Sequence, residues 1–146
     1  MRVVTNSAEE TTVFGKKIAE QLQSGDLLLL KGDLGAGKTT FVQGIAEGLS
    51  ATKNPTSPSF TIMQEYDFPE GIFRHLDLYR LDDPTLDTET LGLPELLTDE
   101  TAITAVEWPE RLKQMWERKG RTIEVIFHYG VGASAREIEA LGLDNN

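Results

Sequence analysis

The segment from Gly32 to Thr39 constrains this chain more than any other part of it. Its sequence, Gly-Asp-Leu-Gly-Ala-Gly-Lys-Thr, fits the phosphate-loop pattern G-x-x-x-x-G-K-[ST] at every fixed position. The preceding run from Asp26 to Lys31 has an apolar centre and predicts a buried strand. An amphipathic helix is expected to follow from Gly37 to about Leu49. Strand, glycine-rich loop and helix together predict a nucleoside triphosphate site with magnesium.

The fixed positions of this loop have separate chemical tasks. Glycines let the backbone curl so that consecutive N–H groups point at phosphate oxygens, and Gly35 in addition keeps side chains out of the cradle. Lys38 is positioned to bridge the β- and γ-phosphates, and the Thr39 hydroxyl can occupy one site on an octahedral Mg²⁺ ion. The base-reading pattern Asn-Lys-x-Asp of regulatory GTPases does not occur in the sequence, which favours ATP over GTP.

Length and composition predict one globular domain over residues 1–146. The chain is 39% hydrophobic, which is enough for an ordinary core. It has no cysteine, so a disulfide scaffold and a cysteine-based zinc site are excluded and a reducing compartment is expected. The first residues carry no apolar leader, and the apolar run Leu27 to Leu30 is too short to span a bilayer. We expect a soluble, cytoplasmic protein without a membrane segment.

The formal net charge is −10, whereas a surface that grips nucleic acid normally carries clustered Lys and Arg. Direct, strong nucleic-acid binding is therefore disfavoured. No basic residue occurs between Leu81 and Glu110, and this stretch is either a solvated face or a docking surface for a basic partner protein. Its acidic residues are Asp82, Asp83, Asp87, Glu89, Glu95, Asp99, Glu100, Glu107 and Glu110.

The remaining segments predict alternating strands and helices. Ser7 to Glu10 has capping-box spacing and predicts a helix that Gly25 closes. Helices are also expected to begin at the two prolines of Asp83-Pro84 and Leu93-Pro94. The strands expected are Phe60–Tyr66, Ile72–Tyr79, Ala102–Glu107 and Thr122–Tyr129, while Ala135–Leu141 suits either a strand or a helix. These elements predict an α/β sandwich of the P-loop NTPase type, with a mainly parallel central sheet plus antiparallel strands.

Two acids end apolar segments and are candidates for the metal site. Glu107 closes the apolar run that begins at Ala102, which is the character of a Walker-B strand, and Asp77 ends the apolar part of another expected strand. Because the carboxyl ends of parallel strands line the ligand crevice of an open α/β sheet, both acids could reach one Mg²⁺ ion. Either acid taken alone would also suit a turn or a helix cap.

Other polar and aromatic residues have less specific patterns. The hydroxyl-rich loop from Thr56 to Thr61 is either a γ-phosphate sensor or an ordinary surface loop. His75 and His128 lack metal-ligand spacing and are interpreted as structural. Trp108 either stacks on an adenine ring or packs in the core.

Four segments in order resemble the bacterial TsaE (YjeE) family of P-loop ATPases, which is required for threonylcarbamoyladenosine modification of tRNA. They are Gly32–Phe41; Ser57-Pro58-Ser59-Phe60-Thr61; His75-Leu76-Asp77-Leu78-Tyr79-Arg80-Leu81; and Glu107-Trp108-Pro109-Glu110. The resemblance covers nearly the whole chain. One departure is Ser59, where the family usually has Thr after Ser-Pro.

The resemblance implies a Mg²⁺-dependent ATPase that supports turnover of a complex of the TsaB and TsaD proteins, slow alone and stimulated by these partners. It implies that Thr39 and Glu107 hold Mg²⁺, with Asp77 supporting the metal or the attacking water. Lys38, Asp77 and Glu107 are the catalytic candidates. The candidates for contact with the nucleotide are Thr11, Leu34, Gly35, Ala36, Gly37, Lys38, Thr39, Thr40, Trp108 and Arg136.

Two other functions stay open on the sequence alone. One is a nucleotide-gated binding module in which ATP sets the conformation of the loop 56–61. The other is a small-molecule kinase, which would need arginines that clamp the transferring phosphoryl group. The arginines beyond the phosphate loop are Arg74, Arg80, Arg111, Arg118, Arg121 and Arg136, and they form no recognisable lid cluster.

Overall fold

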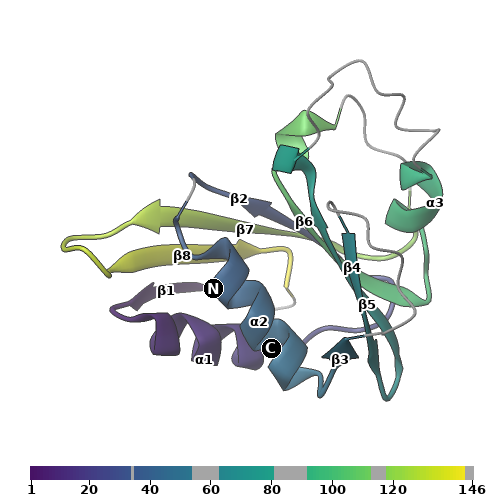
Figure 1. Ribbon diagram of the computed structural model, residues 1–146, viewed down its shortest axis with the longest axis horizontal. Helices are drawn as coiled ribbons and strands as arrows, with labels where there is room; N and C mark the ends of the chain where they lie inside the picture. Colours follow the sequence, from purple (N-terminus) through teal and green to yellow (C-terminus); the bar gives the residue numbers. More distant parts are fainter. Residues whose placement is uncertain (34, 54–62, 81–91, 113–117, 144–146) are drawn as a thin grey trace.

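The computed structural model describes residues 1–33, 35–53, 63–80, 92–112 and 118–143 (Figure 1). Eight strands of this part form one sheet in the order β1-β8-β7-β2-β6-β5-β4-β3. The strands are β1 (Arg2–Thr5), β2 (Leu27–Lys31), β3 (Thr52–Lys53), β4 (Met63–Phe68), β5 (Gly71–Asp77), β6 (Ala102–Glu107), β7 (Thr122–Tyr129) and β8 (Arg136–Leu141). The helices are α1 (Ala8–Ala19), α2 (Lys38–Gly48) and α3 (Leu93–Leu97), with single 3-10 turns η1 (Leu78–Arg80) and η2 (Pro109–Arg111).

The middle of the sheet is parallel and its two edges are antiparallel. β2 pairs in parallel with both β6 and β7, and β6 pairs in parallel with β5. β8 and β1 extend one side by antiparallel pairing, and β4 and β3 extend the other. The expected α/β fold with a parallel centre and added antiparallel strands is confirmed.

The central strand β2 is buried on both faces, because apolar side chains alternate to two separate cores. Leu28 and Leu30 belong to the core that lies under α1 and α2. Leu27 and Leu29 belong to a smaller core on the opposite face, together with Leu93 and other side chains of the α3 side. A continuous run of leucines is what a strand covered on both faces requires.

Glycines bring α1 and α2 into close contact beneath the sheet. A Cβ atom at Gly15 or Gly44 would overlap the backbone of the other helix, and one at Gly48 would lie 2.7 Å from the Cβ atom of Ala19. This close packing fixes α2 against α1 and the sheet, and therefore fixes the end of α2 that begins at the phosphate loop (Figure 1).

The expected start of α1 at Ser7 is confirmed, but the hydrogen bond that the Glu10 carboxylate accepts differs from the one expected. The Ser7 hydroxyl accepts a hydrogen bond from the Glu10 backbone N–H at 3.1 Å. The Glu10 carboxylate accepts from the N–H of Asn6 at 2.6 Å, one residue earlier than a capping box predicts. The helix ends at Ala19 rather than at Gly25.

The segment that the sequence left ambiguous, 135–141, forms the strand β8. The edge strands β1 and β3 were not expected, because each is too short to carry a hydrophobic period. The helix expected at Asp83-Pro84 and the strand residues 60–62 lie outside the described part of the chain. No helix among the described residues is long and apolar enough to cross a membrane.

Arg74 of β5 joins two acids on the side of the sheet away from α1 and α2. Its guanidinium donates to Glu65 at 3.0 Å and to Asp99 at 2.6 Å. Burial alone would raise the pKa of the Asp99 carboxyl, but hydrogen bonds from Thr101 and Arg74 outweigh it and lower this pKa to about 2. Ionised Asp99 therefore stabilises the link between β4, β5 and the turn before β6.

We predict that Asp99→Asn lowers the free energy of unfolding at pH 7 by about 2 kcal/mol. Because the folded pKa is depressed, this contribution is present above about pH 4 and disappears as the pH falls towards 2. Urea denaturation at a series of pH values measures it, with the exposed neighbour Glu100→Gln as control. Equal loss of stability between pH 4 and 2 in wild type and Asp99→Asn would contradict the assignment.

Candidate functional site

The phosphate-loop motif lies where sequence reasoning placed it, between the end of β2 and the start of α2. β2 ends at Lys31, and α2 begins at Lys38 with Gly37 as its N-cap in a left-handed conformation (φ 102°). Among the described residues, no side chain caps the first N–H groups of α2. Free N–H groups at a helix N-terminus form a site for an anion. Leu34 lies outside the described part of the chain.

Two glycines of this loop are required for different reasons. Gly32 has a φ of 150°, and a Cβ atom there would lie 2.8 Å from the backbone oxygen of Phe127 on β7. Gly37 has a φ of 102°, whereas a Cβ atom there would only be in ordinary contact with the side chains of Thr11 and Arg136, at 3.7 and 3.9 Å. The first glycine lets the loop pass close to β7, and the second supplies the left-handed conformation from which α2 begins.

Lys38 is buried, with 4% of its surface exposed. Its Nζ donates to the backbone oxygen of Gly32 at 2.6 Å and lies 3.9 Å from the centre of the Trp108 ring. Burial lowers the pKa of this amine, and the negative charges of Glu107, Glu110 and other nearby acids oppose that shift. The loop backbone and the indole ring together hold the ammonium group in place.

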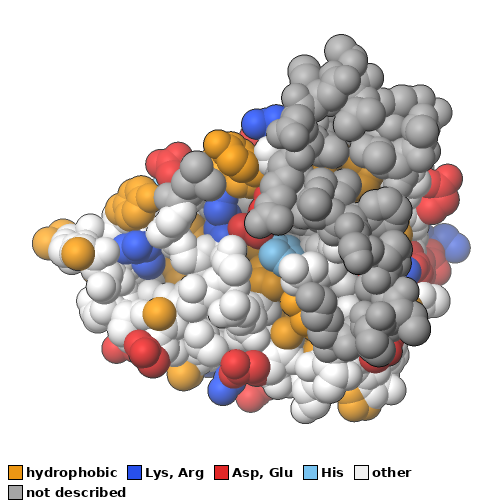
Figure 2. Space-filling model, viewed as in Figure 1, with side chains coloured by type: hydrophobic (Ala, Val, Ile, Leu, Met, Phe, Trp, Pro, Cys, Tyr) orange, Lys and Arg blue, Asp and Glu red, His pale blue; other side chains and the backbone are white. Residues whose placement is uncertain are grey.

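Asp77 and Glu107 meet at the ends of neighbouring parallel strands. They are direct partners in the register of β5 and β6. With Lys38 and Thr39 they line one hollow of about 230 Å³ that the first turn of α2 closes on one side. Figure 2 shows acidic, basic and histidine side chains coming together on this face of the molecule. The structure therefore brings together the four residues predicted for catalysis and metal binding.

The donors in this hollow fit a Mg²⁺ ion that also binds phosphate. Mg²⁺ in nucleotide sites takes a hydroxyl or one or two carboxylates from the protein and completes its shell with phosphate oxygens and water. Thr39 supplies a hydroxyl, and Glu107 and Asp77 supply carboxylates. The described residues hold no group of three or more His, Cys, Asp or Glu that would bind a metal by themselves. A protein-only metal cage is thus not what the described residues build.

Glu107 has one partner that the sequence did not reveal. His75 lies on β5 two residues before Asp77, and its Nε2 atom is 2.6 Å from Oε2 of Glu107. Glu107 is 5% exposed, so this contact is shielded from water. The interpretation of His75 as a merely structural residue left this bond out. The only local signal was its i, i+2 spacing to Asp77, which puts both side chains on the same face of a strand.

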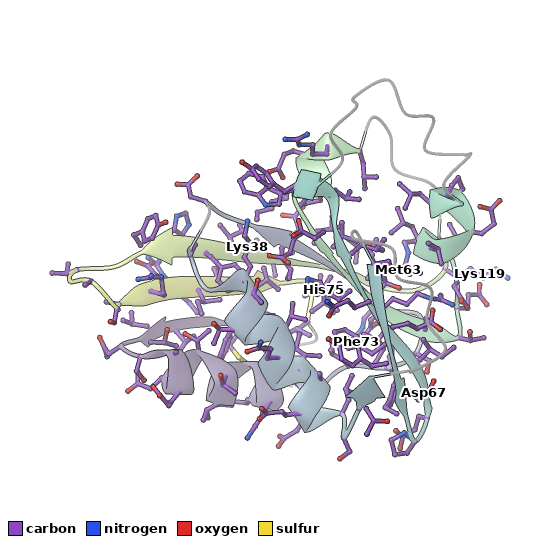
Figure 3. The ribbon with its side chains drawn as sticks, in the orientation of Figure 1. Lys38, Met63, Asp67, Phe73, His75 and Lys119 are labelled. Atoms are coloured by element: carbon purple, nitrogen blue, oxygen red, sulfur yellow. The ribbon has the colours of Figure 1, made fainter. Side chains whose placement is uncertain are left out.

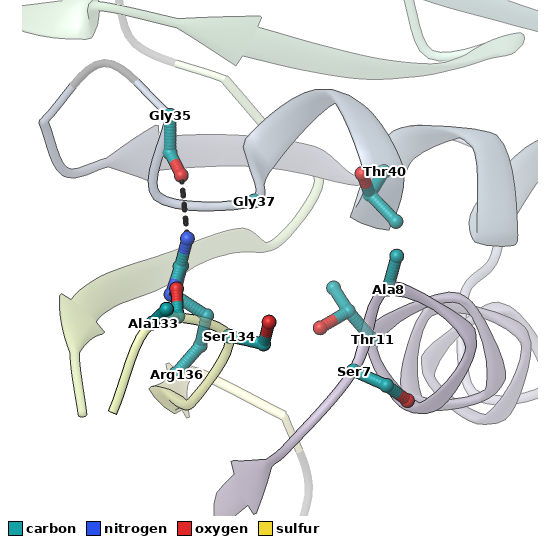
Figure 4. A pocket seen from close by; sticks show the side chains of 9 residues that line it. All are labelled: Ser7, Ala8, Thr11, Gly35, Gly37, Thr40, Ala133, Ser134 and Arg136. Atoms are coloured by element: carbon teal, nitrogen blue, oxygen red, sulfur yellow. Dashed lines mark hydrogen bonds between the residues drawn. The ribbon is translucent and has the colours of Figure 1, made fainter. Parts of the chain in front are cut away.

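A second hollow, of about 170 Å³, lies on the other side of the phosphate loop (Figure 4). Gly35, Gly37 and Thr40 line both hollows. The other residues around the second one are Ser7, Ala8, Thr11, Ala133, Ser134 and Arg136. The phosphate loop is thus the shared wall of two spaces, one with the acids and one with Thr11 and Arg136.

Arg136 connects this second hollow to the loop. Its Nη2 donates to the backbone oxygen of Gly35 at 3.0 Å, drawn as a dashed line in Figure 4. Its Nη1 donates to the backbone oxygens of Ala133 and Ala135. Its Nε atom is buried without a hydrogen-bond partner among the described residues. The other guanidinium nitrogens thus hold Arg136 against the phosphate loop, at the wall of the second hollow.

Thr11, which the resemblance places beside a nucleotide, forms part of the wall of the second hollow. Its hydroxyl shares a 2.7 Å hydrogen bond with the hydroxyl of Thr5, and the residue is buried. Ala36 is also buried, and its N–H donates to the backbone oxygen of Asp33 at 3.2 Å. Contact of either residue with a nucleotide stays a prediction.

Trp108 lies at the first hollow, against Lys38, and not at the second. Its ring centre is 5.0 Å from that of Tyr79, and its backbone has a φ of 60° that side-chain-bearing residues rarely adopt. Backbone strain of this kind persists where surrounding contacts impose it and is concentrated at functional sites. Stacking of this ring on adenine stays a prediction. The hydroxyl-rich loop 56–61 lies outside the described residues.

Comparison with known proteins adds an independent line of evidence. A family profile described as "Threonylcarbamoyl adenosine biosynthesis protein TsaE" matches residues 5–138. A protein of Synechocystis, named tRNA threonylcarbamoyladenosine biosynthesis protein TsaE, is 48% identical over 108 residues, which cover 72% of this chain and 68% of that protein. A protein of the same name from Aquifex aeolicus is 41% identical over 115 residues, covering 76% of this chain and 78% of the relative.

A solved structure shares the fold. The crystal structure of Bacillus subtilis YdiB superposes with a TM-score of 0.71 at 33% sequence identity, covering 99% of this chain and 86% of that one. The overall fold described above is therefore similar to one determined by crystallography.

We predict that Gly32→Ala lowers the free energy of unfolding by about 3 kcal/mol, because it adds both a steric overlap with β7 and a strained φ. Gly132→Ala is the matched control, since that glycine also has a positive φ (99°) but a Cβ atom there would meet nothing within 4 Å. The control is expected to lose about 1 kcal/mol. Equal losses in urea denaturation would show that the approach to β7 is not what requires Gly32.

Proposed function

The chain belongs to the TsaE family of tRNA threonylcarbamoyladenosine biosynthesis proteins, and we propose that it is the ATP-hydrolysing subunit of that modification system. The observation that carries the proposal is the meeting of Lys38, Thr39, Asp77 and Glu107 around one hollow at the carboxyl ends of β2, β5 and β6. A tRNA-modifying role places this work in the cytoplasm.

The two hollows support a division of the nucleotide across the phosphate loop. We place the β- and γ-phosphates over the uncapped start of α2, beside Lys38, and the nucleoside in the hollow with Thr11 and Arg136. The guanidinium of Arg136, held at the wall of this hollow by its bond to Gly35, favours this orientation. Lys38 already lies within hydrogen-bond distance of the loop backbone, so its charge is oriented before the phosphates arrive.

The acids of the first hollow support hydrolysis rather than binding alone. Thr39 and Glu107 would hold Mg²⁺, with Asp77 supporting the metal or the attacking water. Magnesium, when bound, would neutralise charge that develops on the phosphate oxygens. Within the chain, Lys38 stabilises negative charge on the γ-phosphate, and Asp77 is the carboxylate available to orient the water. The rings of Trp108 and Tyr79 lie 5.0 Å apart, and both residues line this hollow.

Three of the six arginines beyond the phosphate loop hold the fold together, which weighs against the kinase alternative. Arg74 is tied to Glu65 and Asp99, and Arg121 to Asp26. Arg118 donates to three backbone oxygens at the opposite end of the parallel strands from the site. These arginines are committed to the fold, so they are not a mobile clamp for a transferring phosphoryl group.

We propose that the chain acts on a complex of TsaB and TsaD and does not itself bind tRNA strongly. The net charge of −10 supports protein contacts over contacts with a phosphate backbone. Part of the acidic stretch 82–110 serves the interior, since Asp99 pairs with Arg74 and Glu107 with His75. The other acids of that stretch remain candidates for a docking surface.

We predict slow ATP hydrolysis by the chain alone and faster hydrolysis with TsaB and TsaD present. Glu107→Gln is expected to lower the rate about 100-fold while ADP binding stays within about threefold, because the phosphate loop is unchanged. Glu100→Gln, an exposed acid before the other end of the same strand, serves as control. Phosphate release and calorimetry measure the two quantities.

Two results would contradict this account. One is a Glu107→Gln variant that hydrolyses ATP at the wild-type rate. The other is tRNA modification at full rate by an assembly carrying that variant, which would favour a nucleotide-gated module in which hydrolysis is incidental.

We predict that Arg136→Gln weakens ADP binding about tenfold, in the absence of metal, because it removes the charged donors beside the nucleoside hollow. Arg2→Gln is the control. Arg2 is an exposed arginine on β1, and it pairs with Glu137, the residue that follows Arg136 on β8. Calorimetry in the presence of a chelator measures both. Unchanged ADP affinity in Arg136→Gln would place the nucleoside elsewhere.

A further inference from the structure

His75 occupies a fixed place behind the carboxylate of Glu107. In the register of β5 and β6 it lies opposite Ala105, two residues before Glu107, while Asp77 lies opposite Glu107 itself. Its side chain and that of Asp77 share one face of β5 because strand side chains alternate. In Figure 3, the label of His75 lies between that of Phe73, two residues earlier on the strand, and that of Lys38.

The contact between His75 and Glu107 is short and shielded. The distance from Nε2 to Oε2 is 2.6 Å, and the two side chains are 11% and 6% exposed. A carboxylate that binds a metal only accepts hydrogen bonds, and in that state of Glu107 the donor of this bond is Nε2 of His75. A charge-assisted bond in a shielded place is stronger than one in water, and it restricts the rotation of the carboxylate.

We propose that His75 is a positioning residue for the metal-holding carboxylate of Glu107. It fixes Oε2 by a hydrogen bond and leaves Oε1 for the ion in the hollow. The inference rests on the proposed function, in which Glu107 holds Mg²⁺. Groups that orient a metal ligand from behind typically affect metal affinity by about 10-fold to 100-fold.

A purely packing role for His75 makes a different prediction. The residue adjoins Phe73 along the strand, and Phe73 is fully buried in the main core. If His75 only filled space there, an apolar side chain of similar length would serve as well as a polar one. If it positions Glu107, an N–H donor at the end of the side chain is the property that matters.

The chain allows a matched pair of substitutions that separates these roles. His75→Gln and His75→Met have side chains of nearly equal length, but only glutamine has an N–H donor that reaches the position of Nε2. His128→Met is the control, because His128 is an exposed histidine on β7. Circular dichroism and thermal melting establish that each variant is folded, and His75→Leu replaces His75→Met if the latter is not.

The measurement is a titration of the intact chain with Mn²⁺ at saturating ADP. The electron paramagnetic resonance signal of free Mn²⁺ reports how much of the ion is bound. We expect His75→Met to weaken Mn²⁺ binding by about 10-fold to 100-fold, and His75→Gln to stay within about threefold of wild type. ADP affinity in a chelator should be the same in all variants. ATP hydrolysis gives a second readout for His75→Met. The Mg²⁺ concentration that gives half-maximal rate should rise by a larger factor than the factor by which the rate at saturating Mg²⁺ falls.

Two outcomes are told apart by including Glu107→Gln in the same titration. Mn²⁺ affinity that depends on Glu107 but is equal in His75→Met and wild type would overturn this inference alone. Mn²⁺ affinity that does not depend on Glu107 would overturn the proposed metal site, and the role of His75 with it. Loss in His75→Met together with recovery in His75→Gln supports the inference.

Discussion

The site depends on the parallel pairing of β2, β6 and β5. Parallel strands end at the same edge of a sheet, so the loop that follows β2 and the acids that end β5 and β6 meet there although they lie far apart in the sequence. Glu107 is the direct register partner of both Leu30 and Asp77, one on each neighbouring strand. A shift of either pairing by one residue would turn the Glu107 carboxylate to the opposite face of the sheet, away from Lys38.

Burial and backbone conformation then determine which groups face a ligand at this edge of the sheet. Lys38 is held by the Gly32 carbonyl and the Trp108 ring, so the loop orients a charge that water would otherwise screen. The antiparallel strand β8, added at the edge of the parallel sheet, carries Arg136 to the other side of the same loop. The parallel centre thus supplies the acids, and the antiparallel edge supplies Arg136 to the wall of the second hollow.

A feature of the site could be predicted from the sequence when the residues that form it are close together in the chain. The loop from Gly32 to Thr39 could be identified because its strand, glycines and helix are contiguous. Asp77 and Glu107 could be proposed because each ends an apolar segment, and only the structure shows that they are register partners. The role of His75 could not be found, since its partner lies 32 positions away and no local pattern links them. The tie from Arg136 to the loop spans 101 positions and depends on an edge strand whose sequence also suits a helix.

The most direct test of the central claim is a crystal structure of the chain with ADP and Mn²⁺, in which anomalous scattering locates the metal. The account predicts one strong peak about 2.1 Å from the hydroxyl oxygen of Thr39 and close to the carboxylate of Glu107, with Glu107 still bonded to His75 and the nucleoside beside Arg136. A peak on the phosphates that lies away from β6, with no approach to Glu107 or Asp77, would contradict it.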